Sequence, residues 1–394
     1  MLDDLDTLME KYEIDALVAT GSAFDSPNIL WLTGFRSPDP IIYLKNRGEE
    51  GLVATAFHAL QRVKSESFIK KTFDLTEEYI GILKENKSMA DNMERFYKPL
   101  LKHEFSGEVL GVPDDFPASQ LVLLQQMGYD VKVVKDLLPR ARATKTSKEL
   151  SIIQKAGDAT TSAISEIVSM IKDSDIGANH TLIYDGEELT VGKVKNRLEH
   201  ALLDCGAESA EDAIVAVGKK GFDWHYLGDP DDKVKSGVPI IMDVFPRLKR
   251  ERYVADVTRT VVKGQGDARL RDMFEAVIAA AGKVIDALTD GAIIDDVNMA
   301  CFNTLKEHGF GSLRLNPVAV EGMTHGLGHG IGLEVHEEPS LYRREERFAA
   351  GNVMAIEPGV YLKDVGGVRI ENDYSVSKGK ARLLTTGLDE MLFV

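Results

Sequence analysis

Short apolar runs alternate with amphipathic stretches over roughly the first 140 residues. Runs rich in aliphatic and β-branched residues predict strands at 14–19, 52–54, 109–112 and 131–134. Between the last two runs, residues 118–127 carry apolar side chains at helical spacing. Strands that alternate with helices predict a small α/β domain over residues 1–140.

The chain becomes polar and basic around residues 138–147, where we expect a domain boundary. Ser147 is expected to cap a helix that continues to about Ile171, because apolar residues recur there at helical spacing. Similar patterns predict helices over residues 267–288 and 294–308. A second, larger domain is therefore expected over residues 147–394.

Two strand pairs in this second region share one plan. An apolar strand ending at Asp243 is followed by a polar turn and a strand that contains Asp256, 13 residues later. A strand ending at Glu357 is followed by a turn and a return strand that ends at Glu371, 14 residues later. The repeated plan predicts two half-domains related by a pseudo-twofold axis, with their four acids converging between them.

Composition narrows the class of protein. The chain has 394 residues, of which 44% are hydrophobic and 28% charged, as expected for a globular protein of about two or three domains. No apolar run predicts a membrane span, and the acidic N-terminus does not resemble a signal peptide, so we expect a cytoplasmic protein without a membrane partner. With 47 basic against 63 acidic residues, the net charge of −16 argues against a nucleic-acid partner. Two distant cysteines form no disulfide framework or cysteine zinc site.

The four paired acids favour a metal site. A carboxylate on an apolar strand is costly to bury unless it is neutralised, hydrogen-bonded or bound to a cation. A single acid of this kind usually reaches water at the end of its strand. Four acids at matched positions instead favour divalent cations, which prefer oxygen ligands.

A glycine-rich segment over residues 325–339 contributes imidazoles. Its alternating glycines oppose a helix and suit an extended chain that something approaches closely. Extended geometry places His325 and His329 on one face. His336 lies an odd number of residues beyond His329 and requires a bend or bulge to join them. Three of the nine histidines fall in this segment, which favours a functional role.

The strings ADVTRT, HGLGHGIGLEVHEEP, AIEPGVY and GGVRIEN strongly resemble those of the pita-bread metallopeptidases, the family of methionine aminopeptidase, aminopeptidase P and prolidase. The resemblance covers residues 147–394. Residues 28–35 resemble part of the extra domain of the prolidase and aminopeptidase P branch. The resemblance implies an α+β fold in which a C-terminal pita-bread domain with pseudo-twofold symmetry follows a smaller α/β N-terminal domain.

The same resemblance implies two divalent metal ions per chain, with Mn²⁺ or Co²⁺ favoured and Fe²⁺ or Zn²⁺ also compatible with such ligands. The implied metal ligands are Asp243, Asp256, His329, Glu357 and Glu371. A hydroxide between the two ions would attack the scissile carbonyl, while Glu357 acts as general base and acid. One departure follows Asp243, where the turn is about two residues longer than the usual family turn.

Further roles follow from the matched motifs. His336 resembles the histidine that donates to the tetrahedral oxyanion, and His325 an additional histidine of the prolidase branch. We assign both to catalysis together with Glu357. Substrate binding is assigned to His225, His336 and Arg369, with Arg369 also placed to hold a ligand carboxylate.

The implied activity is that of an Xaa-Pro dipeptidase, which cleaves small peptides with proline in second position, and the family also implies a homodimer. Aminopeptidase P, which acts on longer peptides, shares every ligand and remains the alternative. A dipeptidase must bind a free carboxylate, for which Arg343, Arg344 and Arg347 are candidates. A non-catalytic binding protein on the same fold is disfavoured because all five ligands are present.

Overall fold

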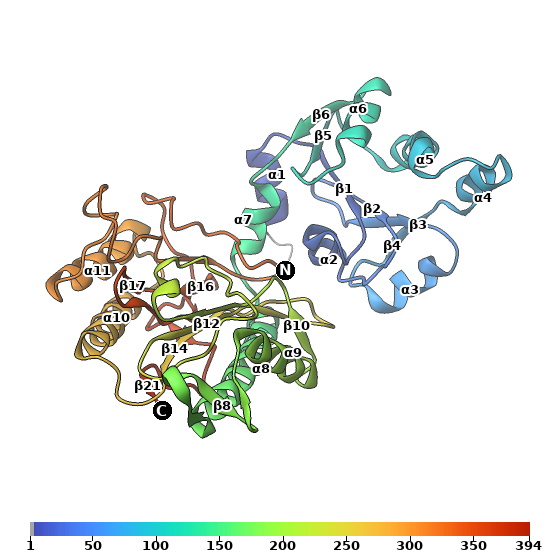
Figure 1. Ribbon diagram of the computed structural model, residues 1–394. Coiled ribbons are helices and arrows are strands. Elements are labelled where there is room, and N and C mark those ends of the chain that lie inside the picture. The colour runs from blue at the N-terminus through green and yellow to red at the C-terminus, as the bar shows by residue number, and fades with distance from the viewer. Residues whose placement is uncertain (1–3) are drawn as a thin grey trace. The chain divides into compact units, whose positions relative to one another are not determined.

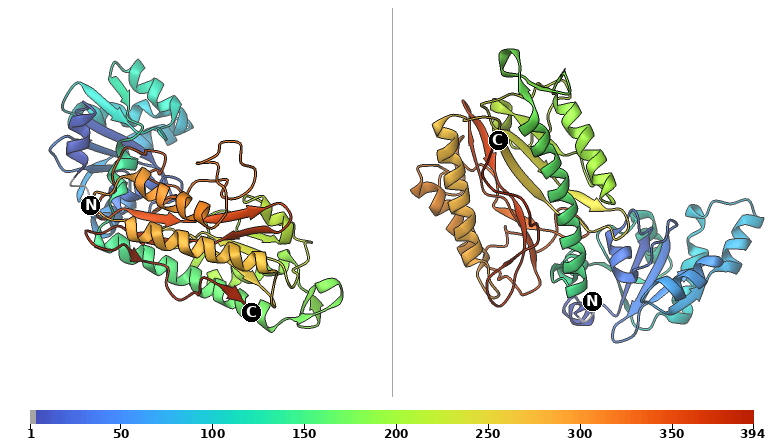
Figure 2. Two further views of the ribbon diagram at one scale, coloured as in Figure 1. Left: turned by 90° about the vertical axis from the view of Figure 1, so that its left-hand side faces the viewer. Right: turned by 90° about the horizontal axis from the view of Figure 1, so that it is seen from below.

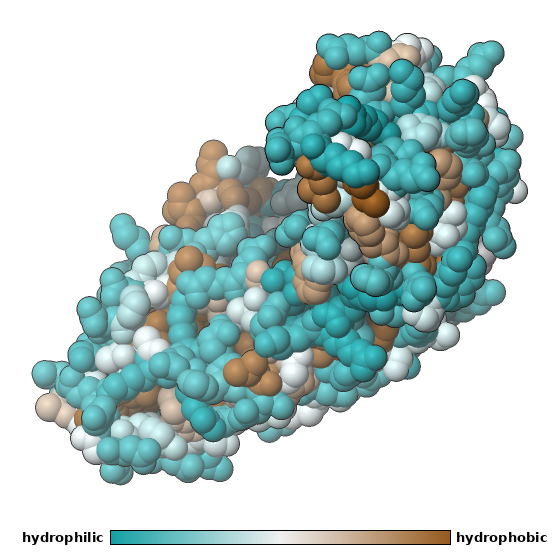
Figure 3. Space-filling view, turned by 90° about the vertical axis from the view of Figure 1, so that its right-hand side faces the viewer, coloured by the Kyte–Doolittle hydropathy of each residue, from teal (hydrophilic) through white to brown (hydrophobic). Residues whose placement is uncertain are grey.

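The computed structural model describes residues 4–394. The chain divides into two compact units, the first ending at Arg142 and the second starting at Ala143 (Figure 1). No helix within residues 4–394 combines the length and the hydropathy needed to cross a membrane. On the face shown in Figure 3, polar residues predominate and apolar residues are scattered among them.

The first unit is built on one six-stranded mixed sheet with the strand order β4-β3-β2-β1-β5-β6. The strands are β1 (Ala16–Gly21), β2 (Ile41–Asn46), β3 (Leu52–Thr55), β4 (Lys71–Asp74), β5 (Val109–Val112) and β6 (Asp130–Val133). The helices are α1 (Leu5–Lys11), α2 (Pro27–Thr33), α3 (His58–Glu66), α4 (Thr76–Lys84), α5 (Glu94–Glu104), α6 (Ala118–Gln126) and α7 (Leu137–Ala143). All four predicted strands are present, and β2 and β4 are additions that the sequence pattern did not indicate.

The motif at residues 28–35 coincides with helix α2. Ser26 caps the helix by accepting the N–H of Ile29, and Gly34 ends it with φ of 61°, a left-handed conformation that suits glycine. Asn28 donates to Asp115 over 3.1 Å and accepts from Nη1 of Arg142 over 2.9 Å. The motif therefore ties the start of α2 to the end of the unit.

The second unit begins with a long helix, α8 (Ser147–Asp173). The prediction that Ser147 caps it is wrong by one residue, because Thr146 forms a capping box with Glu149. The Thr146 hydroxyl accepts the Glu149 N–H, and the Glu149 carboxylate accepts the Thr146 N–H, so Ser147 becomes the first helical residue. The later helices are α9 (Val191–Asp204), α10 (Ala268–Ala287) and α11 (Ile294–Glu307), the last two within a residue of prediction.

Two four-stranded sheets form the centre of this unit. One has the order β11-β12-β14-β21 and the other β15-β16-β19-β20. Their strands are β11 (Ile214–Val217), β12 (Ile240–Val244), β14 (Val257–Val262), β21 (Leu392–Phe393), β15 (Gly328–Gly330), β16 (Val353–Ile356), β19 (Asn372–Ser375) and β20 (Arg382–Leu383). Helices α8 and α9 share an apolar core with the first sheet, and α10 and α11 share one with the second. The two half-domains thus place their sheets between two helical layers (Figure 2).

The acid-bearing arms of the second half differ in detail from the predicted hairpin. The expected pairing of 353–357 with 368–371 is replaced by β16 pairing with β19, while β17 (Gly359–Leu362) pairs with β18 (Gly366–Arg369). Both arms are broken at their acids, Glu357 and Glu371, which lie between these short strands. Pro358 follows Glu357 and has no N–H to donate, which suits a break at that point.

The long turn after Asp243 has a definite structure. Residues Pro246–Leu248 form a short strand, β13, which pairs antiparallel with β10 (Ala207–Ser209). Asp243 itself stays in register within β12, opposite Thr258 of β14. The longer turn therefore extends a neighbouring sheet and leaves the acid within its strand.

Candidate metal centre

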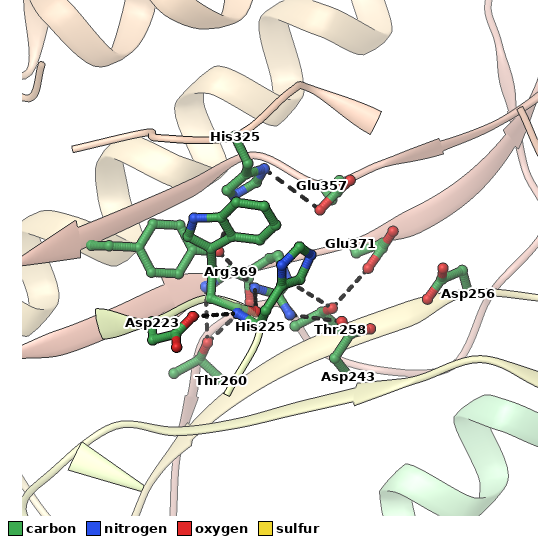
Figure 4. A network of polar contacts seen from close by, with 12 residues as sticks. Asp223, His225, Asp243, Asp256, Thr258, Thr260, His325, Glu357, Arg369 and Glu371 are labelled. Atoms are coloured by element: carbon green, nitrogen blue, oxygen red, sulfur yellow. Dashed lines mark hydrogen bonds and ion pairs between the residues drawn. The ribbon is translucent and has the colours of Figure 1, made fainter. Parts of the chain in front are cut away.

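A cavity of about 850 Å³ opens in the second unit. Every site residue predicted from the sequence lines it, namely His225, Asp243, Asp256, His325, His329, His336, Glu357, Arg369 and Glu371. These side chains come from segments far apart in the chain that the two half-domains bring together. Figure 4 shows the carboxylates of Asp243, Asp256, Glu357 and Glu371 grouped near Arg369 and Thr258.

Asp256, His329 and Glu371 form the tightest group. Each offers one ligand atom, and these atoms lie within 4.8 Å of one another. Nε2 of His329 lies 3.6 Å from Oδ2 of Asp256. Because Nδ1 of His329 faces the carbonyl of Gly330 at 3.1 Å, which can only accept, the ring proton belongs on Nδ1. Nε2 then presents its lone pair toward the acids, as a metal-binding imidazole does.

The buried carboxylates of this site repel one another when they are ionised. Burial, together with the carboxylates of Glu371 and Asp243, raises the pKa of Asp256 well above its usual range. Burial and the carboxylate of Glu357 raise the pKa of Glu371 in the same way. Burial raises the pKa of Glu357 to about 8, although Arg369 opposes the shift. Ionised together, these acids need cations beside them.

Unpaired oxygen atoms show where cations fit. Asp243 Oδ1, Asp256 Oδ1 and Glu371 Oε1 are buried, and none has a hydrogen-bond partner within the part of the chain that the structure describes. Buried polar atoms are normally paired, so three unpaired carboxylate oxygens in one cavity favour a bound cation, which accepts their electron pairs. Carboxylate oxygens with one imidazole nitrogen are suitable ligands for divalent ions. The residues present therefore fit divalent metal binding.

Arg369 links the two half-domains beside this group. Its side chain is buried and donates from Nη2 to Oδ2 of Asp243 over 2.7 Å, from Nη1 to the Tyr361 hydroxyl over 2.7 Å, and from Nε to Oγ1 of Thr258 over 3.1 Å. Thr258 in turn donates to Oε2 of Glu371 over 2.7 Å. Arg369 thus orients one acid directly and a second through Thr258.

His325 ends a hydrogen-bonded chain that starts at this arginine. Nδ1 of His325 faces the Gly326 carbonyl at 2.7 Å, so it carries the proton, and Nε2 accepts from the Tyr361 hydroxyl over 3.0 Å. Burial and Arg369 lower the pKa of His325 to about 3. The ring is therefore neutral, and it lies 3.7 Å from Oε2 of Glu357.

His225 and His336 lie at the more exposed side of the cavity. The His225 ring contacts that of Trp224 at a centroid distance of 3.6 Å with the planes tilted by 52°, and the Trp224 ring lies 5.2 Å from that of His325. Burial and Arg369 lower the pKa of His225. The His336 ring lies 4.2 Å from that of His329, so the bend required by their spacing is present.

Sequence reasoning missed several residues of the site. Tyr361 and Thr258 lie inside the strings AIEPGVY and ADVTRT, but their hydrogen bonds depend on pairing between distant strands. Asp373 accepts the backbone N–H of Asp256 over 3.0 Å, and burial raises its pKa to about 8. Arg314 also lines the cavity, and no sequence signal indicated it.

The sequence pattern that defines metallopeptidase family M24 matches residues 151–378, which is more than half of the chain. The chain belongs to metallopeptidase family M24. This membership confirms the metallopeptidase resemblance and the prediction of a metal-dependent hydrolase. The matched region contains all nine of the predicted site residues.

One relative and two solved structures resemble this chain over nearly its whole length. An Xaa-Pro dipeptidase of Pyrococcus horikoshii is 27% identical over 393 residues, covering 98% of this chain and 96% of that protein. The solved structure of the prolidase of that organism superposes with a TM-score of 0.77 at 24% identity, over 99% of both chains. An X-Pro aminopeptidase of Thermotoga maritima gives a TM-score of 0.78 at 22% identity, over 98% of this chain and 100% of that chain. These likenesses confirm the predicted pita-bread fold.

Proposed function

We propose that this M24 peptidase is an Xaa-Pro dipeptidase with two metal ions, which hydrolyses the bond before proline in small peptides. The observation that carries the proposal is the convergence of Asp256, His329 and Glu371, with ligand atoms within 4.8 Å of one another. It occurs in a chain that resembles an Xaa-Pro dipeptidase over nearly its whole length. The site belongs entirely to the unit that starts at Ala143.

The proposed ligand set adds Glu357 and Asp243 to this trio. One ion would be held by Asp256, His329, Glu357 and Glu371, and the other by Asp243, Asp256 and Glu371. The unpaired oxygens of Asp243, Asp256 and Glu371 support the second of these sites. Such ions, when bound, polarise the scissile carbonyl and lower the pKa of water. We propose Mn²⁺ or Co²⁺, with Fe²⁺ and Zn²⁺ compatible with the same ligands.

Glu357 is the proton carrier of the proposed reaction. Burial raises its pKa to about 8, which supports a group that takes up and releases a proton near neutral pH. As a carboxylate beside a cation, Glu357 would take a proton from water and pass it to the leaving nitrogen of proline. The neutral ring of His325 lies 3.7 Å from Oε2 of Glu357 and adds no competing charge.

The substrate is proposed to lie along the histidine-lined wall of the cavity. His336, whose ring lies 4.2 Å from that of His329, would donate to the oxygen of the scissile carbonyl, where negative charge develops. His225 and the Trp224 ring that it contacts would offer an aromatic wall for the substrate. Arg369 gives its donors to Asp243, Tyr361 and Thr258, and we propose that it serves the substrate by orienting Asp243.

Among the three arginines considered for the substrate carboxylate, Arg344 is the one that lines the cavity. Arg343 forms an ion pair with Glu338 over 2.9 Å, and Arg347 donates to the carbonyl of Gly291 over 2.7 Å. Arg314, also at the cavity, donates to both oxygens of Asp295 over 2.9 and 3.0 Å, whereas Nε of Arg344 lies 3.9 Å from Oδ1 of the same carboxylate, a looser contact. We therefore propose Arg344 as the residue that receives the free carboxylate of a dipeptide.

Cleavage of longer peptides is the second candidate function. A cavity of about 850 Å³ lies near the upper end of the range for small-molecule sites, and a dipeptide does not fill it. This volume favours an aminopeptidase that releases the first residue from longer Xaa-Pro peptides. The two activities share the proposed metal ligands and differ in what lies beyond the proline.

The homodimer and the cytoplasmic location expected from the sequence and the family resemblance are part of this proposal. Light scattering on the purified full chain tests the first. A mass of about twice the 43.4 kDa of one chain supports a dimer, and a mass of one chain contradicts it.

Turnover of Ala-Pro, Ala-Pro-Ala and Ala-Ala by the protein loaded with Mn²⁺ or Co²⁺ tests the function. The proposal predicts release of proline from Ala-Pro and little cleavage of Ala-Ala. Efficient cleavage of Ala-Pro-Ala alone would replace the dipeptidase with the aminopeptidase. Cleavage of neither proline peptide would contradict both candidates.

A further inference from the structure

Lys145 and Glu337 form an ion pair that is almost completely buried. Nζ of Lys145 lies 3.0 Å from Oε2 of Glu337, and the two side chains are 1% and 3% exposed. Removing such charges from water is costly, and the pair persists only with good geometry and further hydrogen bonds. Neither residue belongs to the metal ligands or to the proposed substrate contacts, so the pair has no role in the chemistry described so far.

Glu337 immediately follows His336 and folds the chain around its own carboxylate. Oε1 of Glu337 accepts the N–H of Leu333 over 2.7 Å and that of Glu334 over 3.1 Å. The Glu337 N–H donates to the carbonyl of Gly330 over 2.8 Å. These three bonds close residues 330–337 into a compact loop. The loop supplies the bend that the spacing of His329 and His336 requires.

The glycines of this segment fit around Glu337. A Cβ atom at Gly332 would lie 2.4 Å from Oε2 of Glu337, and a Cβ atom at Gly330 would lie 2.6 Å from its backbone carbonyl oxygen. A side chain at Gly330 would clash with the backbone, and one at Gly332 would displace the Glu337 carboxylate. The glycine spacing in the sequence therefore also serves the packing of this carboxylate.

Lys145 is held by the segment that leads into β16. Its N–H donates to the carbonyl of Gly351 over 2.7 Å, and its neighbour Thr144 forms a β-bridge with Asn352. On the other side, Ile331 of the loop donates to the carbonyl of Val353 over 3.1 Å. The ammonium group thus connects the loop to the start of the strand that precedes Glu357.

We propose that Lys145 and Glu337 are positioning residues that hold His336 against His329 at the cavity. The pair fixes the carboxylate, the carboxylate fixes the turn at Leu333 and Glu334, and the turn fixes the position of the imidazole. The inference rests on the proposed function, because His336 contributes to catalysis only if the cavity binds and cleaves a peptide.

A double-mutant cycle between Glu337 and His336 tests this coupling in the metal-loaded full chain. His336→Ala is expected to lower kcat for Ala-Pro by about 100-fold, as loss of an oxyanion donor does. Glu337→Gln is expected to lower kcat at least tenfold with a small change in KM. The double variant should be no slower than His336→Ala alone, because both changes remove the same contribution. Losses that multiply would overturn the proposal.

Lys145→Met tests the same coupling if Glu337→Gln folds poorly. It removes the ammonium partner of Glu337 and leaves the Glu337 carboxylate in place. Its loss of kcat should likewise vanish in the His336→Ala background. Lys155→Met and Glu251→Gln are the matched controls, because this pair is exposed, with Nζ of Lys155 3.1 Å from Oε1 of Glu251. Both controls should keep wild-type kcat and KM.

A crystal structure of Glu337→Gln, or of Lys145→Met, gives a readout that does not depend on activity. The proposal predicts that His336 leaves its position 4.2 Å from the His329 ring while the metal ligands stay in place. An unmoved His336 would overturn the proposal even if the wild-type protein cleaves no dipeptide. Lack of dipeptide cleavage by the wild type would, by contrast, contradict the proposed function.

Discussion

Arg369 donates from Nη2 to Oδ2 of Asp243 over 2.7 Å, and the two side chains are 2% and 12% exposed. Arg369 ends β18 of the second half-domain, whereas Asp243 lies in β12 of the first. The bond therefore joins the two halves at the point where their acids meet. Oδ1 of Asp243, a residue that lines the cavity, is buried and has no hydrogen-bond partner among residues 4–394.

Arg369→Met should weaken metal binding. The change removes the donor to Asp243 and leaves a buried carboxylate beside three others. Loss of such an orienting partner lowers metal affinity by about 10–100-fold. Titration calorimetry with Mn²⁺ measures the effect. Arg382→Met, on the exposed part of β20, serves as control and should leave the affinity unchanged. Equal affinities for both variants would show that Arg369 does not orient a ligand.

Glu357→Gln should abolish hydrolysis while the fold remains. The amide cannot carry the proton from water to the leaving nitrogen, and loss of such a group costs about 10²–10⁴-fold in kcat. The metal-free variant should also unfold at a higher temperature than the metal-free wild type near pH 8, because one acid with a raised pKa no longer repels its neighbours. Activity within a few fold of wild type would refute the role of Glu357.

The stability of the metal-free protein should fall as pH rises. Asp256, Glu357 and Glu371 have pKa values above those of the unfolded chain, so each binds a proton more tightly in the folded state. Their stabilising effect is complete below the unfolded pKa and is lost as pH rises through the folded value, which for Glu357 means from 4.5 to about 8. Cations then replace the protons.

Thermal unfolding with and without metal measures this linkage. Near pH 8, metal at about 100 times its Kd should raise Tm by about 5–10 °C relative to the protein with chelator. At the same metal concentration near pH 5.5, the rise in Tm should be clearly smaller, because protons compete for the same oxygens and weaken metal binding. A metal effect that is independent of pH would contradict the clustering of ionised ligands.

Arg344→Gln should raise KM for a dipeptide more than KM for the corresponding dipeptide amide. If Arg344 receives the carboxylate of proline, its loss should raise KM for Ala-Pro by about tenfold or more, the worth of a charged hydrogen bond. KM for Ala-Pro-amide, which has no carboxylate, should change little. Arg347→Gln is the matched control, since Arg347 donates to Gly291 and does not line the cavity. Equal effects on both substrates would remove Arg344 from this role.

The outline of the site could be predicted because it follows from local patterns. An acid at the end of an apolar strand is visible in the sequence, as at Asp243 and Glu357, and its repetition indicates that the strands face one another. The glycines around His329 likewise indicate an extended chain that another element approaches closely. Strand and helix types in both units follow from periodicity, which reports which side chains are buried.

The connections between these residues could not be predicted, because they depend on pairing across the two halves. Thr258 bonds to Glu371 because β14 lies beside the segment between β18 and β19. The cap of α8 moved from Ser147 to Thr146 because both residue types can cap and the position of Glu149 decides between them. Arg344 was one of three arginines on an irregular loop, where no periodicity indicates direction.

Metal content tests the central claim most directly. The full chain, purified without chelator, loaded with Mn²⁺ or Co²⁺ and freed of excess ion, is analysed beside Asp256→Asn, which alters an acid shared by both proposed sites. The account predicts about two divalent ions per wild-type chain and a marked loss in the variant. A wild-type chain that retains no divalent ion, or a variant that retains as many as the wild type, would contradict it.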